Sequence, residues 1–179
     1  MRKESKERVR VISSGNYEKQ LSLVSIKQVS GKFYLSLMKI AIINGPNLNL
    51  LGKREPEIYG SKSFEEYLDE IKAAFPSVVF TYFQSNVEGE LINAIQQAGD
   101  NAEGIILNPA GYTHTSVALG DAIAAVKANV LEVHISNIHA REDFRKISHV
   151  SAKCVGTITG LGLKGYELAV NWFMQNEKG

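Results

Sequence analysis

The sequence predicts an α/β protein, with a parallel β-sheet covered by helices on both faces. From Lys39 onward, short apolar runs alternate along the chain with longer segments whose apolar residues recur at helical spacing. The short runs are apolar at successive positions, which is typical of strands buried on both faces of a parallel sheet. The chain has 179 residues, of which 44% are hydrophobic and 22% charged, enough for the core of one ordinary domain.

Five apolar runs are the predicted strands. They are residues 39–44, 78–84, 104–108, 130–135 and 155–159. Because such strands alternate here with helical patterns, we expect a single domain built on a doubly wound, flavodoxin-like sheet of five parallel strands. In folds of this kind the ligand lies outside the carboxyl ends of the strands.

Four segments are the predicted helices. The first has the clearest boundaries, because Ser63 is suited to cap its amino end and Pro76 stops it. Glu65 and Glu66 lie in its first turn, where negative charge suits the helix dipole. The four helices are expected over residues 64–75, 88–98, 115–127 and 163–175.

Residues 1–37 differ in composition from the rest of the chain. They hold eight Lys and Arg against three Glu, whereas the remaining 142 residues carry a net charge of −4. They lack a continuous apolar stretch, which argues against a secretory signal. Residues 21–29 are partly alternating and could add an edge strand to the sheet. Met38 could itself be the natural start, so we expect residues 1–37 to be a non-essential extension, poorly ordered or non-native, rather than a functional arm.

Charge, cysteine content and hydropathy argue against several classes of protein. The net charge of +1 gives no reason to expect nucleic-acid binding. A single cysteine, Cys154, excludes an intramolecular disulfide framework and fits a reducing compartment. No run approaches the roughly 18 apolar residues of a membrane span. We therefore expect a cytoplasmic protein without nucleic-acid or membrane partners.

The loop after the first predicted strand is the most informative segment. It covers about sixteen residues, 45–60, whereas strand-to-helix connections usually have about two to six. Asn47, Arg54 and Tyr59 give it an amide, a guanidinium and a phenol. We expect this loop to form part of an active site and to close over a ligand as a lid.

Polar side chains also follow the other predicted strands. Because the carboxyl ends of parallel strands meet at one edge of a sheet, these side chains should converge. Glu132 and His134 are two apart on one strand and should share a face, as in a general acid oriented by a carboxylate. A buried ion pair is the alternative. The converging residues are Asn47, Arg54, Tyr59, Gln84, Ser85, Asn86, Asn108, His114, Glu132, His134, Asn137, Arg141 and Arg145.

Two other kinds of site have weaker support. No spacing of Cys, His or paired carboxylates suits zinc, so we expect no metal. The segment Gly160-Leu-Gly-Leu-Lys-Gly165 has the form GxGxxG, but only fourteen residues follow it, too few for the further strand and acidic residue of a dinucleotide site. These glycines are expected to serve a tight turn and close helix–sheet packing.

Three motifs together resemble the type II 3-dehydroquinate dehydratases. The similarity extends over about residues 38–174, and residues 38–179 are then the catalytic domain. It implies the dehydration of 3-dehydroquinate to 3-dehydroshikimate in the shikimate pathway, without a cofactor, by a dodecamer built from four trimers. The motifs are Asn44-Gly-Pro-Asn-Leu48 with Leu51-Gly-Lys-Arg-Glu-Pro56 and Tyr59-Gly60, then Thr113-His-Thr-Ser116, then Glu132-Val-His-Ile-Ser-Asn137 with Arg145.

The resemblance also implies roles for single residues. Tyr59 matches the family's base, and Arg54 lies where a guanidinium would favour its phenolate. Asn47 matches the residue that helps to hold the enolate oxygen through water. His134 matches the proton donor, oriented by Glu132.

Substrate binding is implied for a further set of positions, with Arg145 suited to the substrate carboxylate. Asp121 matches a residue that reaches the neighbouring subunit's site, although Gly120 stands where many family members have arginine. The substrate-binding set is Asn108, His114, Asp121, Ile135, Ser136 and Arg145.

Two other functions remain as alternatives. A dehydratase that uses a lysine Schiff base would need a lysine at the site, and only Lys53 lies near it. A non-catalytic, flavodoxin-like small-molecule-binding module would share the fold but not the chemistry. Bound flavin would make such a protein yellow.

Overall fold

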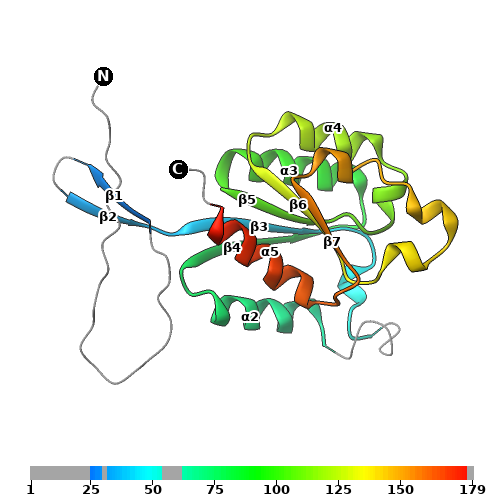
Figure 1. Cartoon of the computed structure of the whole chain (residues 1–179), viewed down its shortest axis with the longest axis horizontal. Helices are drawn as coiled ribbons and strands as arrows, with labels where there is room; N and C mark the ends of the chain where they lie inside the picture. The colour runs from blue at the N-terminus through cyan, green and yellow to red at the C-terminus, as the bar shows by residue number, and fades with distance from the viewer. Residues whose placement is uncertain (1–24, 30–31, 54–61, 177–179) are drawn as a thin grey trace.

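A five-stranded, all-parallel sheet forms the centre of the protein, as the sequence predicts (Figure 1). The computed structural model describes residues 25–29, 32–53 and 62–176. Neighbouring strands lie in the order β4-β3-β5-β6-β7, which is the flavodoxin-like order and confirms the predicted fold class. The strands are β3 (Met38–Asn44), β4 (Val78–Gln84), β5 (Gly104–Asn108), β6 (Asn129–His134) and β7 (Gly156–Thr159).

Four α-helices of the described residues cover the sheet, close to the predicted positions. Ser63 caps α2 with a complete capping box, since its hydroxyl accepts from the Glu66 N–H and the Glu66 carboxylate accepts from the Ser63 N–H. α4 begins two residues later than predicted, because Ser116 is its cap and accepts from the Leu119 N–H. The helices are α2 (Phe64–Ala74), α3 (Glu88–Asn101), α4 (Val117–Ala125) and α5 (Lys164–Gln175).

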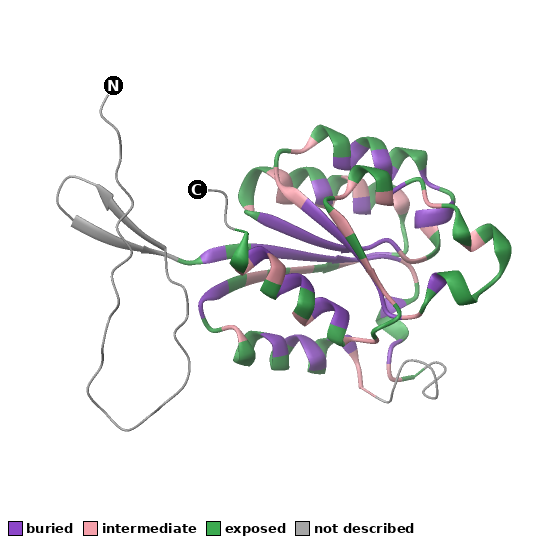
Figure 2. Ribbon diagram, viewed as in Figure 1, coloured by how far each residue is buried: buried purple, intermediate pink, exposed green. Residues whose placement is uncertain are grey.

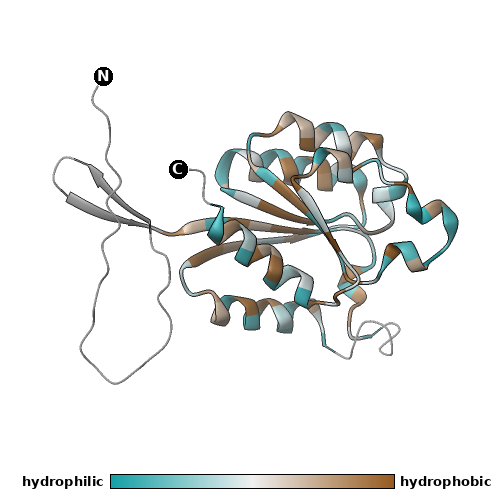
Figure 3. Cartoon of the chain, in the orientation of Figure 1, coloured by the Kyte–Doolittle hydropathy of each residue, from teal (hydrophilic) through white to brown (hydrophobic). Residues whose placement is uncertain are grey.

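The helices lie in two layers, with α2 and α5 on one face of the sheet and α3 and α4 on the other (Figure 1). Alternate side chains of each central strand therefore enter different cores. In β3, Ile40 and Ile42 pack in the core beneath α2 and α5, whereas Ala41 and Ile43 pack in the core beneath α3 and α4. The central strands are buried and hydrophobic along their length, while the outer helix faces are exposed (Figures 2 and 3).

The N-terminal part differs from one sequence expectation. β1 (Ser25–Val29) does not add an edge strand to the main sheet. It pairs antiparallel with β2 (Lys32–Ser36) in a separate two-stranded sheet. Only two residues separate these strands in the sequence, so their pairing costs little chain entropy. Among the described residues, no helix combines the length and the apolar character that crossing a membrane would require.

The glycine-rich segment after β7 has the structural role expected of it. Gly160 and Gly162 have φ angles of +84° and +61°, a left-handed conformation that suits glycine in a tight turn. A Cβ on Gly165 would lie 3.1 Å from Val133 Cγ1, so this glycine lets α5 approach the sheet closely. The turn and the packing account for all three glycines.

Candidate active site

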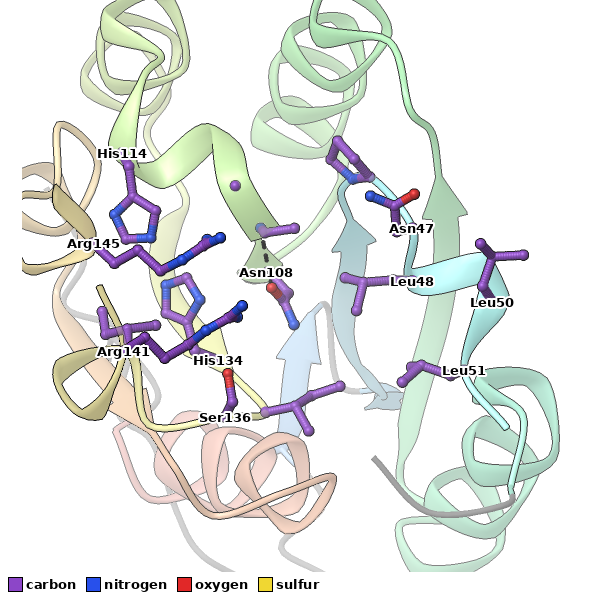
Figure 4. A pocket seen from close by; sticks show the side chains of 15 residues that line it. Asn47, Leu48, Leu50, Leu51, Asn108, His114, His134, Ser136, Arg141 and Arg145 are labelled. Atoms are coloured by element: carbon purple, nitrogen blue, oxygen red, sulfur yellow. Dashed lines mark hydrogen bonds between the residues drawn. The ribbon is translucent and has the colours of Figure 1, made fainter. Parts of the chain in front are cut away.

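A pocket of about 240 Å³ lies at the carboxyl edge of the sheet, as the fold rule predicts (Figure 4). Its walls come from the loops that follow β3, β5 and β6, which are far apart in the chain. The loop after β3 carries a short 3₁₀ helix, Leu48–Leu50, and the loop after β5 carries another, Ala110–His114. The lining residues are Pro46, Asn47, Leu48, Leu50, Leu51, Asn108, Ala110, Gly111, His114, His134, Ile135, Ser136, Ile138, Arg141 and Arg145.

The loops after β3 and β5 pass each other at Gly45. The Gly45 N–H donates to the Asn108 carbonyl at 2.7 Å, and a Cβ on Gly45 would lie only 2.7 Å from the Pro109 carbonyl oxygen. Only glycine fits this crossing without a shift of the backbone. The close approach brings Asn47 and Asn108 to one pocket. The Asn47 N–H also donates to Asn86 Oδ1 at 2.9 Å, which gives Asn86 a role in holding the loop.

Glu132 and His134 share one face of β6, as predicted. Nε2 of His134 lies 2.7 Å from Oε1 of Glu132. The exposed fraction is 0% for Glu132 and 5% for His134, and only His134 reaches the pocket. The carboxylate therefore lies behind the imidazole, where it can orient the ring and support its protonated form.

Hydroxyl groups surround the Glu132 carboxylate. Thr113 donates to Oε1, and Ser151 and Thr157 donate to Oε2. Burial is the largest single influence on the pKa of Glu132 and raises it. The hydrogen bond and charge of His134 and the hydrogen bonds from Ser151 and Thr113 all lower this pKa, and together they outweigh burial. The net pKa lies below the ordinary value, so the group is an anion at neutral pH. Sequence reasoning assigned no role to these hydroxyl groups: Thr113 begins the Thr113–Ser116 motif, whereas Ser151 and Thr157 lie in none of the three motifs.

His114 has a defined tautomer. Its Nδ1 lies 2.8 Å from the Ile147 carbonyl oxygen, which can only accept, so Nδ1 carries the hydrogen. Burial is the main cause that lowers the pKa of His114 below its ordinary value, and the charges of His134 and Arg145 act in the same direction. The ring is therefore favoured as a neutral group with Nε2 as a free acceptor.

Two arginines from the segment after β6 give the pocket positive charge. Arg145 Nε donates to the Glu142 carboxylate at 2.7 Å, and Arg141 Nε lies 3.7 Å from the same carboxylate. Figure 4 shows both guanidinium groups directed into the pocket beside His114 and His134. Arg141 belongs to the predicted strand-end cluster but has no predicted binding role, and it lines the pocket. Two guanidinium groups with imidazoles and amides suit a small, polar anion.

Gln84, Ser85, Asn86 and Asn137 were predicted to converge with the others but do not line the pocket. The other predicted catalytic and binding residues fall into three groups. Ile135 and Ser136 line the pocket. Asp121 is exposed on α4 and does not line the pocket of its own chain. Arg54 and Tyr59 lie outside the described residues. Gly120 is buried against the chain itself, since a Cβ there would lie 2.6 Å from the His149 carbonyl oxygen.

Metal-ligating side chains do not cluster in the part of the chain that the structure describes. No group of three or more His, Cys, Asp or Glu is arranged there to hold an ion. Cys154 is half-buried, and burial raises the pKa of its thiol to about 12. This thiol is not a ready nucleophile at neutral pH.

Comparison with known proteins gives a consistent result. The family model described as "Dehydroquinase class II" matches residues 38–174. A 3-dehydroquinate dehydratase of Fusobacterium nucleatum is 55% identical over 144 residues, which are 77% of this chain and 97% of that protein. An Exiguobacterium 3-dehydroquinate dehydratase is 51% identical over 140 residues, 78% of this chain and 96% of that protein.

Solved structures agree with the sequence comparison. The type II dehydroquinase from Propionibacterium acnes is 41% identical with a TM-score of 0.74, and the match covers 79% of this chain and 100% of that one. The type II dehydroquinase from Butyrivibrio crossotus is 45% identical with a TM-score of 0.73, covering 78% of this chain and 98% of that one. Both similarities extend over nearly the whole length of the solved chains.

Proposed function

This chain belongs to the class II dehydroquinase family and is a 3-dehydroquinate dehydratase, and we propose that it carries out the reaction with Tyr59 as the base and His134 as the acid. The observation that carries the mechanism is the buried Glu132–His134 pair, which opens into the pocket through the imidazole alone. The reaction is a step of the shikimate pathway. It proceeds without a cofactor, and we place the enzyme in the cytoplasm.

The reaction needs two proton transfers and a stabilised intermediate. The substrate has a ketone, a C–H bond beside it and a hydroxyl group one carbon further on. Tyr59, as phenolate, takes the proton of that C–H bond. The electron pair of the broken C–H bond then forms an enolate with the ketone. The enolate then expels the hydroxyl group, which takes a proton from His134 and leaves as water. A double bond conjugated to the ketone remains.

His134 must be positively charged to act as the acid. The Glu132 carboxylate supports that charge from 2.7 Å, and its own hydroxyl partners keep it ionised. Because both groups are buried, water does not compete for the proton within the pair. The charged ring carries a hydrogen on both nitrogens, so Nε2 donates to Glu132 and Nδ1 is left to give its hydrogen to the leaving hydroxyl group.

The other pocket residues bind the substrate. Arg145 holds the carboxylate of 3-dehydroquinate, because its planar fork can donate to both oxygens. The free Nε2 of His114 accepts from a substrate hydroxyl group. Asn108, Ser136 and the backbone of Ile135, which line the same pocket, bind the remaining hydroxyl groups.

The proposed roles of Tyr59 and Arg54 require the loop after β3 to be long enough to bring them to the pocket. Leu51 lines the pocket, and Tyr59 is eight residues further along the chain. An extended chain spans about 3.3–3.6 Å per residue, so eight residues are enough for the Tyr59 phenol to reach a substrate in the pocket. Arg54 favours the phenolate by its charge, and Asn47 holds the enolate oxygen through water.

The assembly is a dodecamer of four trimers. Asp121 is exposed on α4 and away from its own pocket, which suits a residue that completes the site of a neighbouring subunit. Mass photometry tests this proposal, since twelve subunits of 19.7 kDa are readily distinguished from three or one. A monomer that turns over substrate at the full rate would overturn the role of Asp121.

A direct assay tests the mechanism. Purified protein is mixed with 3-dehydroquinate while the absorbance of the conjugated enone product is followed. Tyr59→Phe and His134→Ala should nearly abolish turnover, with unchanged circular dichroism spectra. Retained activity in either variant would refute its role. Inactivation by borohydride in the presence of substrate would instead indicate a lysine Schiff base.

A further inference from the structure

A buried tyrosine of the C-terminal helix is connected to the floor of the pocket by hydrogen bonds. Tyr166 is on α5, and its exposed fraction is 0%. Its hydroxyl group donates to Asn44 Oδ1 at 2.8 Å and accepts from Asn108 Nδ2 at 3.0 Å. Asn44 and Asn108 are the last residues of the adjacent strands β3 and β5. One phenol therefore joins the two strand ends from which the pocket is built.

Each hydrogen bond of this network has one possible direction. The Ala110 N–H donates to the Asn108 side chain at 3.1 Å, so the atom facing it must be Oδ1 (dashed line in Figure 4). Nδ2 of Asn108 then faces Tyr166 and donates to it. The phenol must in turn give its own hydrogen to Asn44. Burial raises the pKa of Tyr166, which keeps that hydrogen in place at every physiological pH.

We propose that Tyr166 is a positioning residue of the active site, which holds the Asn108 amide in the orientation that the substrate requires. This inference rests on the proposed function, in which Asn108 binds a substrate hydroxyl group. With Tyr166 on one side and Ala110 on the other, the amide cannot exchange its oxygen and nitrogen by a half-turn. The second N–H and the second lone pair of Asn108 are then presented in one fixed arrangement.

Packing alone does not account for the phenol. The ring of Tyr166 lies 5.0 Å from the ring of Phe64 and 6.4 Å from the ring of Tyr67, between centroids, and phenylalanine would make the same contacts. A hydroxyl group buried in this core requires partners. Its two partners are both amides at strand ends, and one of them lines the pocket.

Tyr166→Phe tests the role of the hydroxyl group, and Tyr67→Phe is its matched control. Tyr67 packs in the same core, but its hydroxyl group donates to the Leu163 carbonyl at 2.6 Å and lies 3.0 Å from Glu167 Oε1, and neither residue lines the pocket. Steady-state kinetics with 3-dehydroquinate should show a KM about five-fold higher in Tyr166→Phe, with kcat changed less than about two-fold, as expected from one lost hydrogen bond that orients a binding group. Tyr67→Phe should leave both values within about two-fold. Equal KM values in the two variants would overturn the proposal.

A double-mutant cycle shows whether Tyr166 acts through Asn108. In an Asn108→Ala background, Tyr166→Phe should have almost no further effect on kcat/KM, because the amide to be oriented is gone. Full additivity of the two effects would refute the connection.

A readout independent of activity separates this inference from the proposed function. The Asn108 side-chain amide gives a pair of NMR signals, assigned by their loss in Asn108→Ala. Tyr166→Phe should shift both signals and speed their exchange with water, whereas Tyr67→Phe should leave them unchanged. If the wild-type protein were inactive and Tyr166→Phe still shifted the Asn108 signals, the dehydratase function alone would be refuted. If Tyr166→Phe left these signals unchanged, the positioning role alone would be refuted.

Discussion

The charge on Glu132 should set the rate of proton donation by His134, and Glu132→Gln tests this directly. Glutamine has nearly the shape of glutamate. It keeps one oxygen to accept from His134, and its new amide can donate to the hydroxyl groups of Ser151 and Thr157, which contact Oε2 in the wild-type protein. The substitution therefore removes the negative charge while it preserves the packing.

The magnitude follows from the kind of hydrogen bond that is lost. A bond between charged groups contributes about 1.5–3 kcal/mol, and a neutral one about 0.5–1.5 kcal/mol. The difference of about 1–2 kcal/mol raises the free energy of the positively charged imidazole that must form before the proton is given up, so less of the enzyme is in the reactive form, which corresponds to a decrease in kcat of up to about five- to thirty-fold.

The assay is the initial rate of enone formation at saturating 3-dehydroquinate, with the circular dichroism spectrum as a check on folding. Glu103→Gln is the matched control, because this exposed carboxylate also accepts a hydrogen bond, from the Lys39 N–H, but lies at the opposite end of β5. The control should keep its kcat. A kcat of Glu132→Gln within about two-fold of wild type would refute the argument that the carboxylate supports the charged imidazole.

Three further predictions concern stability and binding. Because the pKa of Glu132 lies below its ordinary value of 4.5, its ionised form stabilises the fold above that pH, and this stability is lost as the pH falls through the folded pKa. Urea midpoints at pH 7 and pH 4 should therefore differ less in Glu132→Gln than in wild type, and equal differences would contradict the pKa direction. Gly45→Ala should cost about 1–3 kcal/mol in urea unfolding, since its Cβ would lie 2.7 Å from the Pro109 oxygen, while Gly89→Ala, with open space around its Cβ, should not. Arg145→Lys should raise KM about ten-fold with little change in kcat, because an ammonium cannot donate to both carboxylate oxygens, and an unchanged KM would exclude Arg145 as the carboxylate partner.

Sequence patterns with a local physical cause were reliable guides here. The continuous apolar runs predicted strands that are buried on both faces, and β3 indeed places Ile40 and Ile42 in one core and Ala41 and Ile43 in the other. Ser63 was predicted to cap the first helix, and it is the N-cap of α2. The period of two along a strand predicted that Glu132 and His134 lie side by side, and the 2.7 Å contact between them confirms it.

Sequence patterns were less reliable where a segment could form backbone hydrogen bonds with more than one partner. Residues 21–29 were predicted as a possible further strand of the main sheet, but β1, residues 25–29, pairs with the segment only two residues away. Thr115, the first residue of the predicted third helix, instead caps the end of the 3₁₀ helix Ala110–His114, and Ser116 caps the start of α4. In both cases, the hydrogen-bond partner decided the outcome, and hydrophobic spacing does not encode it.

The sequence by itself determined the fold class, the edge of the sheet where the site lies and the residue types that gather there. All three follow from periodicity along the chain and from the rule that parallel strands end together. Only the tertiary structure decided which groups touch. The hydroxyl groups of Thr113 and Ser151 donate to Glu132, although each residue is 19 positions away from it in the sequence. Tyr166 donates to Asn44, which is 122 positions away. Such contacts depend on the order and register of the strands and on how closely helices pack against them, and these are properties of the whole chain rather than of any segment.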